Sequence, residues 1–255
     1  MRRARLFYRR NVKEILKSSF GYTCFLGFPV AVLILFRFIA HYELHRVAWL
    51  HPAYFVPSLT LCMFAFMTPC MAYLVARDFS SAYLLRLSLS PLQKGEMLLG
   101  YTLPGFTIGI LQFLVCALTL VVLGWIDGIV VSPLHLLQAM LVQTPALLFF
   151  IELGILIGCT KRESVALVIS AFCLVFGFLL SDTWAPLPSS GNLTKWASHI
   201  PFYAAVRLGR HYTLHTSEVL MRDVWLTLVY ALASLLCAAG TFCLKMTRPC
   251  PKSRS

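Results

Sequence analysis

Apolar segments alternate with shorter polar ones along most of the chain. Six of the apolar segments come close to or reach the roughly 20 residues that a helix needs to cross a bilayer. Their approximate limits are residues 21–40, 56–75, 103–123, 135–158, 164–181 and 224–244, and the fifth is the shortest. The pattern therefore predicts an all-α polytopic membrane protein with six transmembrane helices, in a single domain over residues 1–255.

Residues 1–20 precede the first of these segments and mix two kinds of side chain. Basic residues are interleaved with apolar ones, which are Leu6, Phe7, Val12, Ile15 and Leu16. A basic amphipathic stretch of this kind is typical of a helix that lies in the membrane interface. Because the apolar run after it lacks a small-residue cleavage site, we expect no signal peptide and a retained first span.

The composition supports a membrane protein. Of the 255 residues, 59% are hydrophobic and 13% are charged, and the mean hydropathy is +0.77. A soluble domain is about half apolar and about a quarter charged. The formal net charge of +12 does not point to nucleic acid, since the basic residues flank the apolar segments, where topology signals and contacts with anionic lipid occur. We expect the lipid bilayer, and no nucleic acid, among the partners.

The basic residues also orient the chain. With six spans both termini lie on one side of the membrane, and that side holds Arg2, Arg3, Arg5, Arg9, Arg10, Lys13, Lys17, Arg77, Arg86, Lys94, Lys161, Arg162, Lys245, Arg248, Lys252 and Arg254. The opposite loops hold Arg46, Lys195, Arg207, Arg210 and Arg222. Since basic loops stay in the cytoplasm, we expect cytoplasmic termini in a multi-pass protein of a cell membrane.

The predicted cytoplasmic stretch between the second and third spans is RDFSSAYLLRLSLSPLQKGEMLLGY, residues 77–101. Its apolar positions recur at helical spacing, at Phe79, Tyr83, Leu84 and Leu87. Ser90 and Pro91 are of the types favoured at the cap and first position of a helix. We therefore predict a short helix that begins at Asp78 and ends near Ser88, and a second helix from Pro91. These residues alone leave open whether the first helix lies on lipid headgroups or docks against a cytoplasmic partner.

The order of these features resembles the membrane subunits of ABC-2-type transporters. The motifs that carry the resemblance are Arg77-Asp78, residues 83–87 (YLLRL), Ser90-Pro91-Leu92 and residues 96–100 (EMLLG). The usual Glu-Lys/Arg-Gly-Thr opening of this segment is replaced here by Arg77-Asp78-Phe79-Ser80-Ser81. The resemblance extends to residues 184–210, where Pro186, Pro188, Pro201-Phe202-Tyr203 and Arg207 match a proline-rich break followed by short re-entrant helices between the fifth and sixth spans.

The resemblance implies a permease subunit of an ATP-driven exporter. Two such subunits, identical or related, pair around the path, and each receives a separate ABC ATPase subunit. The chain itself has no G-x-x-x-x-G-K-[ST] phosphate loop. We therefore expect no enzyme activity and no cofactor on this chain. The partner ATPase would bind ATP and Mg, and the chain itself would lie in a bacterial plasma membrane. Residues 184–210 are most similar to the drug and antibiotic exporters, which implies a hydrophobic or amphiphilic small cargo such as a drug, antibiotic or peptide. A lipid-linked polysaccharide or teichoic-acid-type polymer is the alternative.

The resemblance also assigns a surface on which the ATPase would act, the coupling helix between spans 2 and 3. Its residues are Asp78, Phe79, Tyr83, Leu84, Arg86, Leu87, Ser90 and Pro91. The apolar members would fill a groove on the partner and Arg86 would set charge complementarity. Lys161 and Arg162, in the turn between the fourth and fifth spans, form either a second contact or simply a basic inside loop.

Three polar residues fall inside predicted spans and are candidates for the translocation path: Glu152, Gln143 and Gln112. A carboxylate at membrane depth is costly, so Glu152 should face protein or a water-filled path, or be protonated. The alternative is structural, because polar side chains also hydrogen-bond neighbouring helices within a membrane.

Other classes of function find less support in the chain. A membrane-embedded enzyme needs clustered nucleophile, base or metal ligands, and neither G-x-S-x-G nor H-E-x-x-H is present. HYELH at 41–45 and HYTLH at 211–215 place histidines four apart, but no cysteine or carboxylate cluster completes a site, so we predict no bound metal. A scaffold that only anchors a soluble complex would not need a buried acid such as Glu152.

Overall fold

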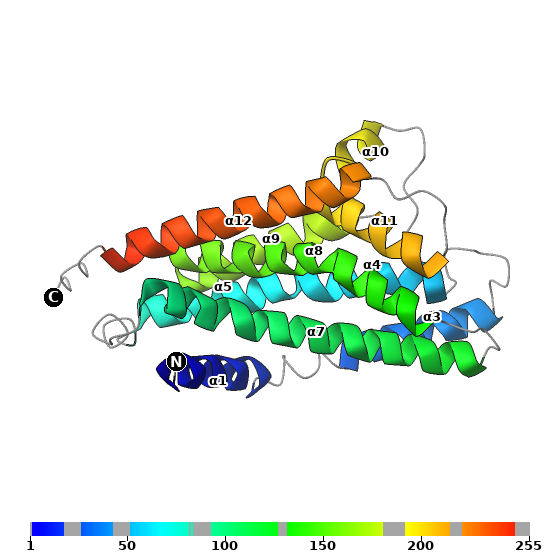
Figure 1. Ribbon diagram of the computed structural model, residues 1–255, viewed down its shortest axis with the longest axis horizontal. Coiled ribbons are helices and arrows are strands. Elements are labelled where there is room, and N and C mark those ends of the chain that lie inside the picture. The colour runs from blue at the N-terminus through cyan, green and yellow to red at the C-terminus, as the bar shows by residue number, and fades with distance from the viewer. Residues whose placement is uncertain are drawn as a thin grey trace.

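The computed structural model describes residues 2–17, 27–42, 52–81, 83, 93–126, 132–180, 192–214 and 221–247. Within these ranges the regular structure is helical and contains no strand, which agrees with the predicted all-α class. The helices are α1 (Arg2–Lys17), α3 (Phe28–Tyr42), α4 (Pro52–Ala65), α5 (Met67–Ser80), α7 (Lys94–Ile126), α8 (Pro133–Thr160), α9 (Glu163–Leu180), α10 (Asn192–Ala197), α11 (Pro201–Leu214) and α12 (Met221–Thr247). Most of the long ones run along the longest axis of an elongated bundle (Figure 1).

Four helical stretches are long and apolar enough to cross a membrane, by length and composition, among the residues described. They are Tyr54–Ser80, Lys94–Ile126, Pro133–Thr160 and Met221–Thr247, at the positions of the predicted second, third, fourth and sixth spans. Shorter apolar helices, Val30–Ile39 and Glu163–Phe176, lie where the first and fifth spans were predicted. The chain is therefore a multi-pass helical protein with four candidate spans, and the count of six remains a prediction.

The helices α4 and α5 form one span that is interrupted at Phe66. Pro69 lies four residues after Ala65, and a proline ring clashes with the carbonyl of the residue four positions before it while donating no hydrogen bond. The backbone therefore turns between Ala65 and Met67, and Phe66 has φ −64° and ψ −17°. The interruption separates α4 from α5, which packs on α8 and α9.

Two glycines allow α8 to approach α5 closely. A Cβ at Gly154 would lie 2.5 Å from the carbonyl oxygen of Thr68, and one at Gly158 would lie 2.7 Å from that of Ala72. Glycines four residues apart on a helix are a common device for close packing within membranes. The hydroxyl of Thr68 also donates to the carbonyl of Phe150, at 3.1 Å. The seam between α5 and α8 thus forms a tight centre of the bundle.

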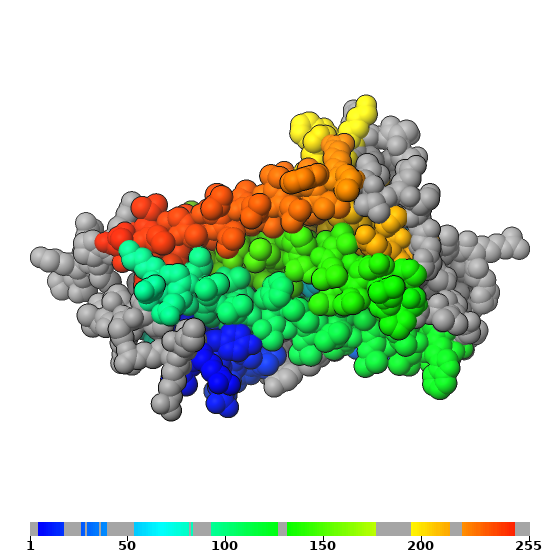
Figure 2. Space-filling model, viewed as in Figure 1, coloured from blue at the N-terminus to red at the C-terminus, as the bar shows by residue number. Residues whose placement is uncertain are grey.

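The bundle has two ends of different composition. Figure 1 places α1, the end of α5, the start of α7 and the end of α12 towards one end, and α10 and α11 near the other. In the space-filling view, α7 and α12 make up most of the visible face, with the side chains of α1 at its edge (Figure 2). The described basic residues of α1, Lys94 at the start of α7, Lys161 and Arg162 in the turn between α8 and α9, and Lys245 near the end of α12 lie towards the first end, which we call the basic end. Its cytoplasmic location remains a prediction from charge.

The helix α11 fills the opposite end of the bundle. Arg210, on α11, donates from Nη2 to the hydroxyl of Ser58 at 2.7 Å and from Nε to the carbonyl of Tyr54 at 3.2 Å. Gln143, on α8, donates to the carbonyl of Ala205 at 3.3 Å. These bonds hold α11 between α4 and α8, in the region where short re-entrant helices were predicted.

The predicted boundary of the coupling helix differs from the structure. Asp78, Phe79 and Ser80 belong to the last turn of α5, not to a separate helix that begins at Asp78. The helix ends because Ser81 is extended, with φ −98° and ψ 163°. Its hydroxyl donates to the carbonyl of Asp78 at 3.1 Å and accepts the backbone N–H of Tyr83 at 3.3 Å. The remainder of the predicted helix, residues 84–88, and the predicted start of the second helix at Ser90-Pro91 lie outside the described residues.

Candidate functional site

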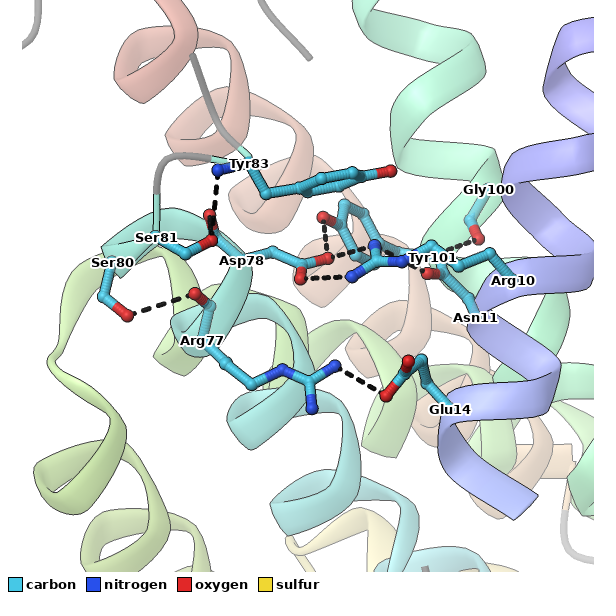
Figure 3. A network of polar contacts seen from close by, with 10 residues as sticks. All are labelled: Arg10, Asn11, Glu14, Arg77, Asp78, Ser80, Ser81, Tyr83, Gly100 and Tyr101. Atoms are coloured by element: carbon cyan, nitrogen blue, oxygen red, sulfur yellow. Dashed lines mark hydrogen bonds and ion pairs between the residues drawn. The ribbon is translucent and has the colours of Figure 1, made fainter. Parts of the chain in front are cut away.

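A buried carboxylate lies where α5 ends. Asp78 is 2% exposed, and its two oxygens accept 2.7 Å bonds from Nη1 and Nη2 of Arg10, on α1. The hydroxyl of Tyr101, on α7, donates to Oδ2 at 2.8 Å (Figure 3). A forked guanidinium–carboxylate pair is among the strongest and most directional contacts in proteins. Three donors thus compensate the loss of water around Asp78 and join α1, α5 and α7 at one side chain.

The guanidinium of Arg10 is fixed on its other faces as well. It lies 4.0 Å from the ring centre of Tyr83, a cation–π contact, and Nη1 also donates to the side chain of Asn11 at 3.3 Å. The hydrogen bond with Asp78 raises the pKa of Arg10 above its ordinary value, so its charge persists at any pH of interest. Burial raises the pKa of the Tyr83 phenol, so the ring that contacts the Arg10 guanidinium stays neutral.

The helix α1 reaches this position because one of its faces matches α7. Phe7, Asn11 and Ile15 recur at four-residue spacing and are all buried. The amide of Asn11 donates to the carbonyl of Gly100 at 2.8 Å, and Phe7 covers the place that a Cβ of Gly100 would occupy. Phe7 also meets the ring of Tyr101 edge to face, with centroids 5.0 Å apart. Only a glycine at position 100 permits this approach.

The position of α1 refines the prediction of an interfacial helix. Its apolar residues Phe7 and Ile15 pack within the protein, whereas Leu6 is 62% exposed. Arg5, Arg9 and Lys13 share the exposed side of the helix. The outward face is therefore mainly basic, and contact of this face with lipid headgroups remains a prediction.

Further contacts extend the junction to α9 and α12. Nη2 of Arg77 donates to Glu14 at 2.9 Å, and this bond lowers the pKa of the Glu14 carboxyl. The hydroxyl of Ser80 donates to Oε1 of Glu163, at the start of α9, at 2.5 Å. Phe79 meets Phe242 of α12 edge to face at 5.6 Å. We call the set Arg10, Asp78, Tyr83 and Tyr101, with these neighbours, the Asp78 junction.

The structure places the residues of the predicted coupling surface in different settings. Asp78 and Phe79 face into the bundle, and Tyr83 lies partly buried over α1. Lys161 and Arg162 are exposed in the turn between α8 and α9. Leu84, Arg86, Leu87, Ser90 and Pro91 lie outside the described residues. Contact of any of them with a partner remains a prediction.

Sequence reasoning missed two members of the junction, Arg10 and Tyr101. Arg10 is one of several basic residues in α1, and Tyr101 follows a leucine-rich stretch without special spacing. The available signal was the helical phase of α1, since Arg10 is adjacent to the buried stripe of Phe7, Asn11 and Ile15. A basic residue beside such a stripe can reach a buried acid.

The three candidate path residues are enclosed between helices. Glu152 and Gln143 are 0% exposed and Gln112 is 1% exposed. Oε1 of Glu152 accepts a 2.7 Å bond from the hydroxyl of Thr102, and Gln143 also donates to the carbonyl of Pro57 at 3.0 Å. Within the described part of the chain, Oε2 of Glu152 and both polar atoms of Gln112 make no hydrogen bond. Their part in a translocation path is untested.

A groove beside the junction was not foreseen. It has a volume of about 940 Å³ and lies between α1, the α4–α5 span and α9. Phe66, Cys70 and Leu74 form one wall, and residues 167–175 of α9 form the other. Glu14, Lys17 and Arg77 lie at its rim. None of Glu152, Gln143 and Gln112 lines this groove.

Histidines do not assemble a metal site in the described residues, where no three or more His, Cys, Asp or Glu side chains are grouped to hold an ion. HYELH beyond Tyr42 and the final histidine of HYTLH lie outside these residues. That neither motif binds a metal therefore remains a prediction from the sequence.

Comparison with protein families identifies a match over most of the chain. Residues 52–242, from the start of α4 to near the end of α12, match the model of the family described as "ABC-2 family transporter protein". The match covers most of the chain and includes Asp78 and Tyr101, but it excludes α1 and its Arg10. No curated protein matches the chain.

Proposed function

Because the chain belongs to the ABC-2 family of transporter proteins, we propose that it is the permease subunit of an ATP-driven exporter. Membership makes it a membrane component of ABC transport, a class in which ATP hydrolysis belongs to a separate subunit. Two copies, or this chain and a related one, would enclose the path. Each would receive an ATPase at the basic end.

The observation that carries the mechanism is the Asp78 junction. The segment that follows α5 begins at Ser81, and Tyr83 is stacked on Arg10. A partner that moves this segment therefore moves the end of α5, and with it the carboxylate of Asp78. That carboxylate is bonded to α1 through Arg10 and to α7 through Tyr101. Three helices would then move together when the ATPase closes around nucleotide.

The strength of these bonds favours joint movement over rupture. Removing one partner of a buried ion pair costs about 3–5 kcal/mol, because the other charge is left without compensation. A shift of α5 alone would separate the Arg10 and Asp78 side chains and carry a cost of this kind. The contact of Phe79 with Phe242 adds α12 to the moving unit. The basic end would act as one block whose displacement opens or closes the path deeper in the membrane.

For the cargo, we propose a hydrophobic or amphiphilic small molecule. The similarity of residues 184–210 to drug and antibiotic exporters supports this class.

The test is to purify the tagged chain from its own membranes and to measure the ATPase activity that co-purifies with it. We expect vanadate-sensitive hydrolysis by a second protein that carries a phosphate loop, identified by mass spectrometry. Replacing Tyr83 and Leu87 together by aspartate should abolish this association while leaving membrane insertion intact. The control is Leu6→Asp, an exposed site on α1. Unchanged ATPase association in the double variant would contradict the proposed contact surface.

A further inference from the structure

The groove between α1, α5 and α9 has the build of an amphiphile-binding site. Its walls are apolar, with Phe66, Leu74 and Leu174 among the lining residues. Its volume of about 940 Å³ is at the upper end of the roughly 300–1,000 Å³ typical of sites for small organic ligands. Among the described lining residues, the charged ones are Glu14 and Lys17 of α1 and Arg77, which contacts Glu14. The site therefore separates an apolar body from a charged rim.

The rim carries a net positive charge. Arg77 and Lys17 lie there together with Glu14. Glu14 is engaged by Arg77, at 2.9 Å, and the charges of Arg10 and Lys17 also act on its carboxyl. One carboxylate thus faces more than one cation, and Lys17 is exposed. An anion placed near Lys17 would complete the charge balance.

The outer wall of the groove is continuous with a surface that faces away from the bundle. Leu167, Val168 and Val175 line the groove and are also exposed. Phe172 and Phe176, on the same helix, are exposed as well. A helix of this composition in a multi-pass protein presents such a face to hydrocarbon. A molecule already dissolved in the bilayer can therefore enter the groove sideways, without crossing water.

We propose that this groove binds one phospholipid with an anionic headgroup. Its acyl chains lie between α5 and α9, and its phosphate lies at Lys17 and Arg77. The apolar walls select a lipid over a free phosphate, and the cationic rim selects an anionic headgroup over a zwitterionic one. The bound lipid would tie α1 to α9 beside the Asp78 junction. The proposal requires only that the chain lies in a bilayer and does not depend on the ATPase.

The experiment is native mass spectrometry of the purified full chain, released from nanodiscs that contain equal amounts of phosphatidylglycerol and phosphatidylcholine. We expect one phosphatidylglycerol to be retained in preference to phosphatidylcholine. Ala171→Trp, which fills the groove from α9, should lower retention about tenfold, a change equal to one decade in affinity. The matched control is Ala233→Trp, an exposed alanine on α12 away from the groove, which should retain the lipid as the parent does.

A second pair of variants tests the headgroup. Lys17→Gln should reduce the preference for phosphatidylglycerol about fivefold, the order expected for one cation near an anionic lipid. Lys13→Gln, on the exposed side of the same helix, should leave it unchanged. Equal retention in both tryptophan variants would overturn the proposal, as would an unchanged preference in Lys17→Gln. Cross-linking of Cys70 between two copies, with no lipid retained, would also overturn it and assign the groove to subunit pairing.

Discussion

Two buried carboxylates, Asp78 and Glu152, show how differently the chain treats the same chemical group. Asp78, at the basic end, accepts three short bonds, two of them from a guanidinium. Glu152, in the second half of α8, accepts one bond from Thr102, and its other oxygen makes no hydrogen bond within the described residues. The first is built into a rigid connection between helices. The second keeps one oxygen without a hydrogen bond among the described residues, and its part in a path remains a prediction.

Of the two carboxylates, Asp78 should show the larger loss of stability on substitution. Asp78→Asn removes the charge while keeping the shape, and it leaves the Arg10 guanidinium without its carboxylate. We expect a loss of about 3 kcal/mol, at the lower end for a buried ion pair because Arg10 keeps some exposure. Thermal unfolding of the purified protein in detergent measures it. The control is Glu163→Gln, whose partner Ser80 is an exposed hydroxyl; an equal effect in both variants would contradict the special role of Asp78.

A smaller effect is expected at the hydrogen bond from α7. Tyr101→Phe removes one neutral donor to the charged carboxylate and leaves the ring contacts with Phe7 and Phe242 in place. Hydrogen bonds to charged groups contribute about 1.5–3 kcal/mol, and the same unfolding assay applies. Tyr8→Phe is the matched control, since its hydroxyl meets Thr107 at an exposed position. A loss as large for Tyr8→Phe would mean that the junction adds nothing beyond an ordinary surface bond.

Substitution of Glu152 should cost much less stability than substitution of Asp78. Glu152→Gln keeps an oxygen to accept the bond from Thr102, so we expect a change of about 1 kcal/mol or less. If Glu152 contributes to the path, ATP-driven transport by the reconstituted complex falls while ATPase association stays intact. A large loss of stability with normal transport would instead make Glu152 a structural residue like Asp78.

The smallest effect concerns the rim pair of Glu14 and Arg77. The bond from Arg77 lowers the pKa of Glu14 below its ordinary value near 4.5, so the pair stabilises the protein above that pH. The contribution disappears as pH falls through the lowered folded-state pKa. Because both groups are about one-third exposed, we expect about 0.2–1 kcal/mol. The difference in stability between the parent and Glu14→Gln should be present at pH 7 and vanish in acid; a difference that grows in acid would contradict this sign.

The sequence predicted the parts of the fold that depend on hydrophobic length. Four of the predicted spans lie within long apolar helices, because each has a long enough apolar run to be found, but the helices extend beyond the predicted limits. The start of the coupling helix was misplaced because Asp78 and Phe79 fit the helical phase of α5 as well as that of a new helix. What separates the two is the turn at Ser81, which depends on local hydrogen bonds of its hydroxyl.

The candidate site was predicted only in part, and the reason is long-range contact. Asp78 was selected from its motif, but its partner Arg10 lies 68 positions away in the sequence. The helical phase of α1 places Arg10 beside the buried stripe and Arg9 on the exposed side, but no local pattern identifies Asp78 as the partner of Arg10. The groove was likewise invisible, since its walls come from three separate helices. Glu152, by contrast, was found from its depth in the span alone.

The central claim is that movement of the partner ATPase reaches α1 through Arg10 and Asp78. Hydrogen–deuterium exchange of residues 5–17, compared between the nucleotide-free and vanadate-trapped complexes, tests it most directly. We expect a nucleotide-dependent change in the parent that is lost in Arg10→Lys, which keeps the charge but cannot form both bonds to Asp78. An identical change in Arg10→Lys, with the ATPase still bound, would contradict the claim.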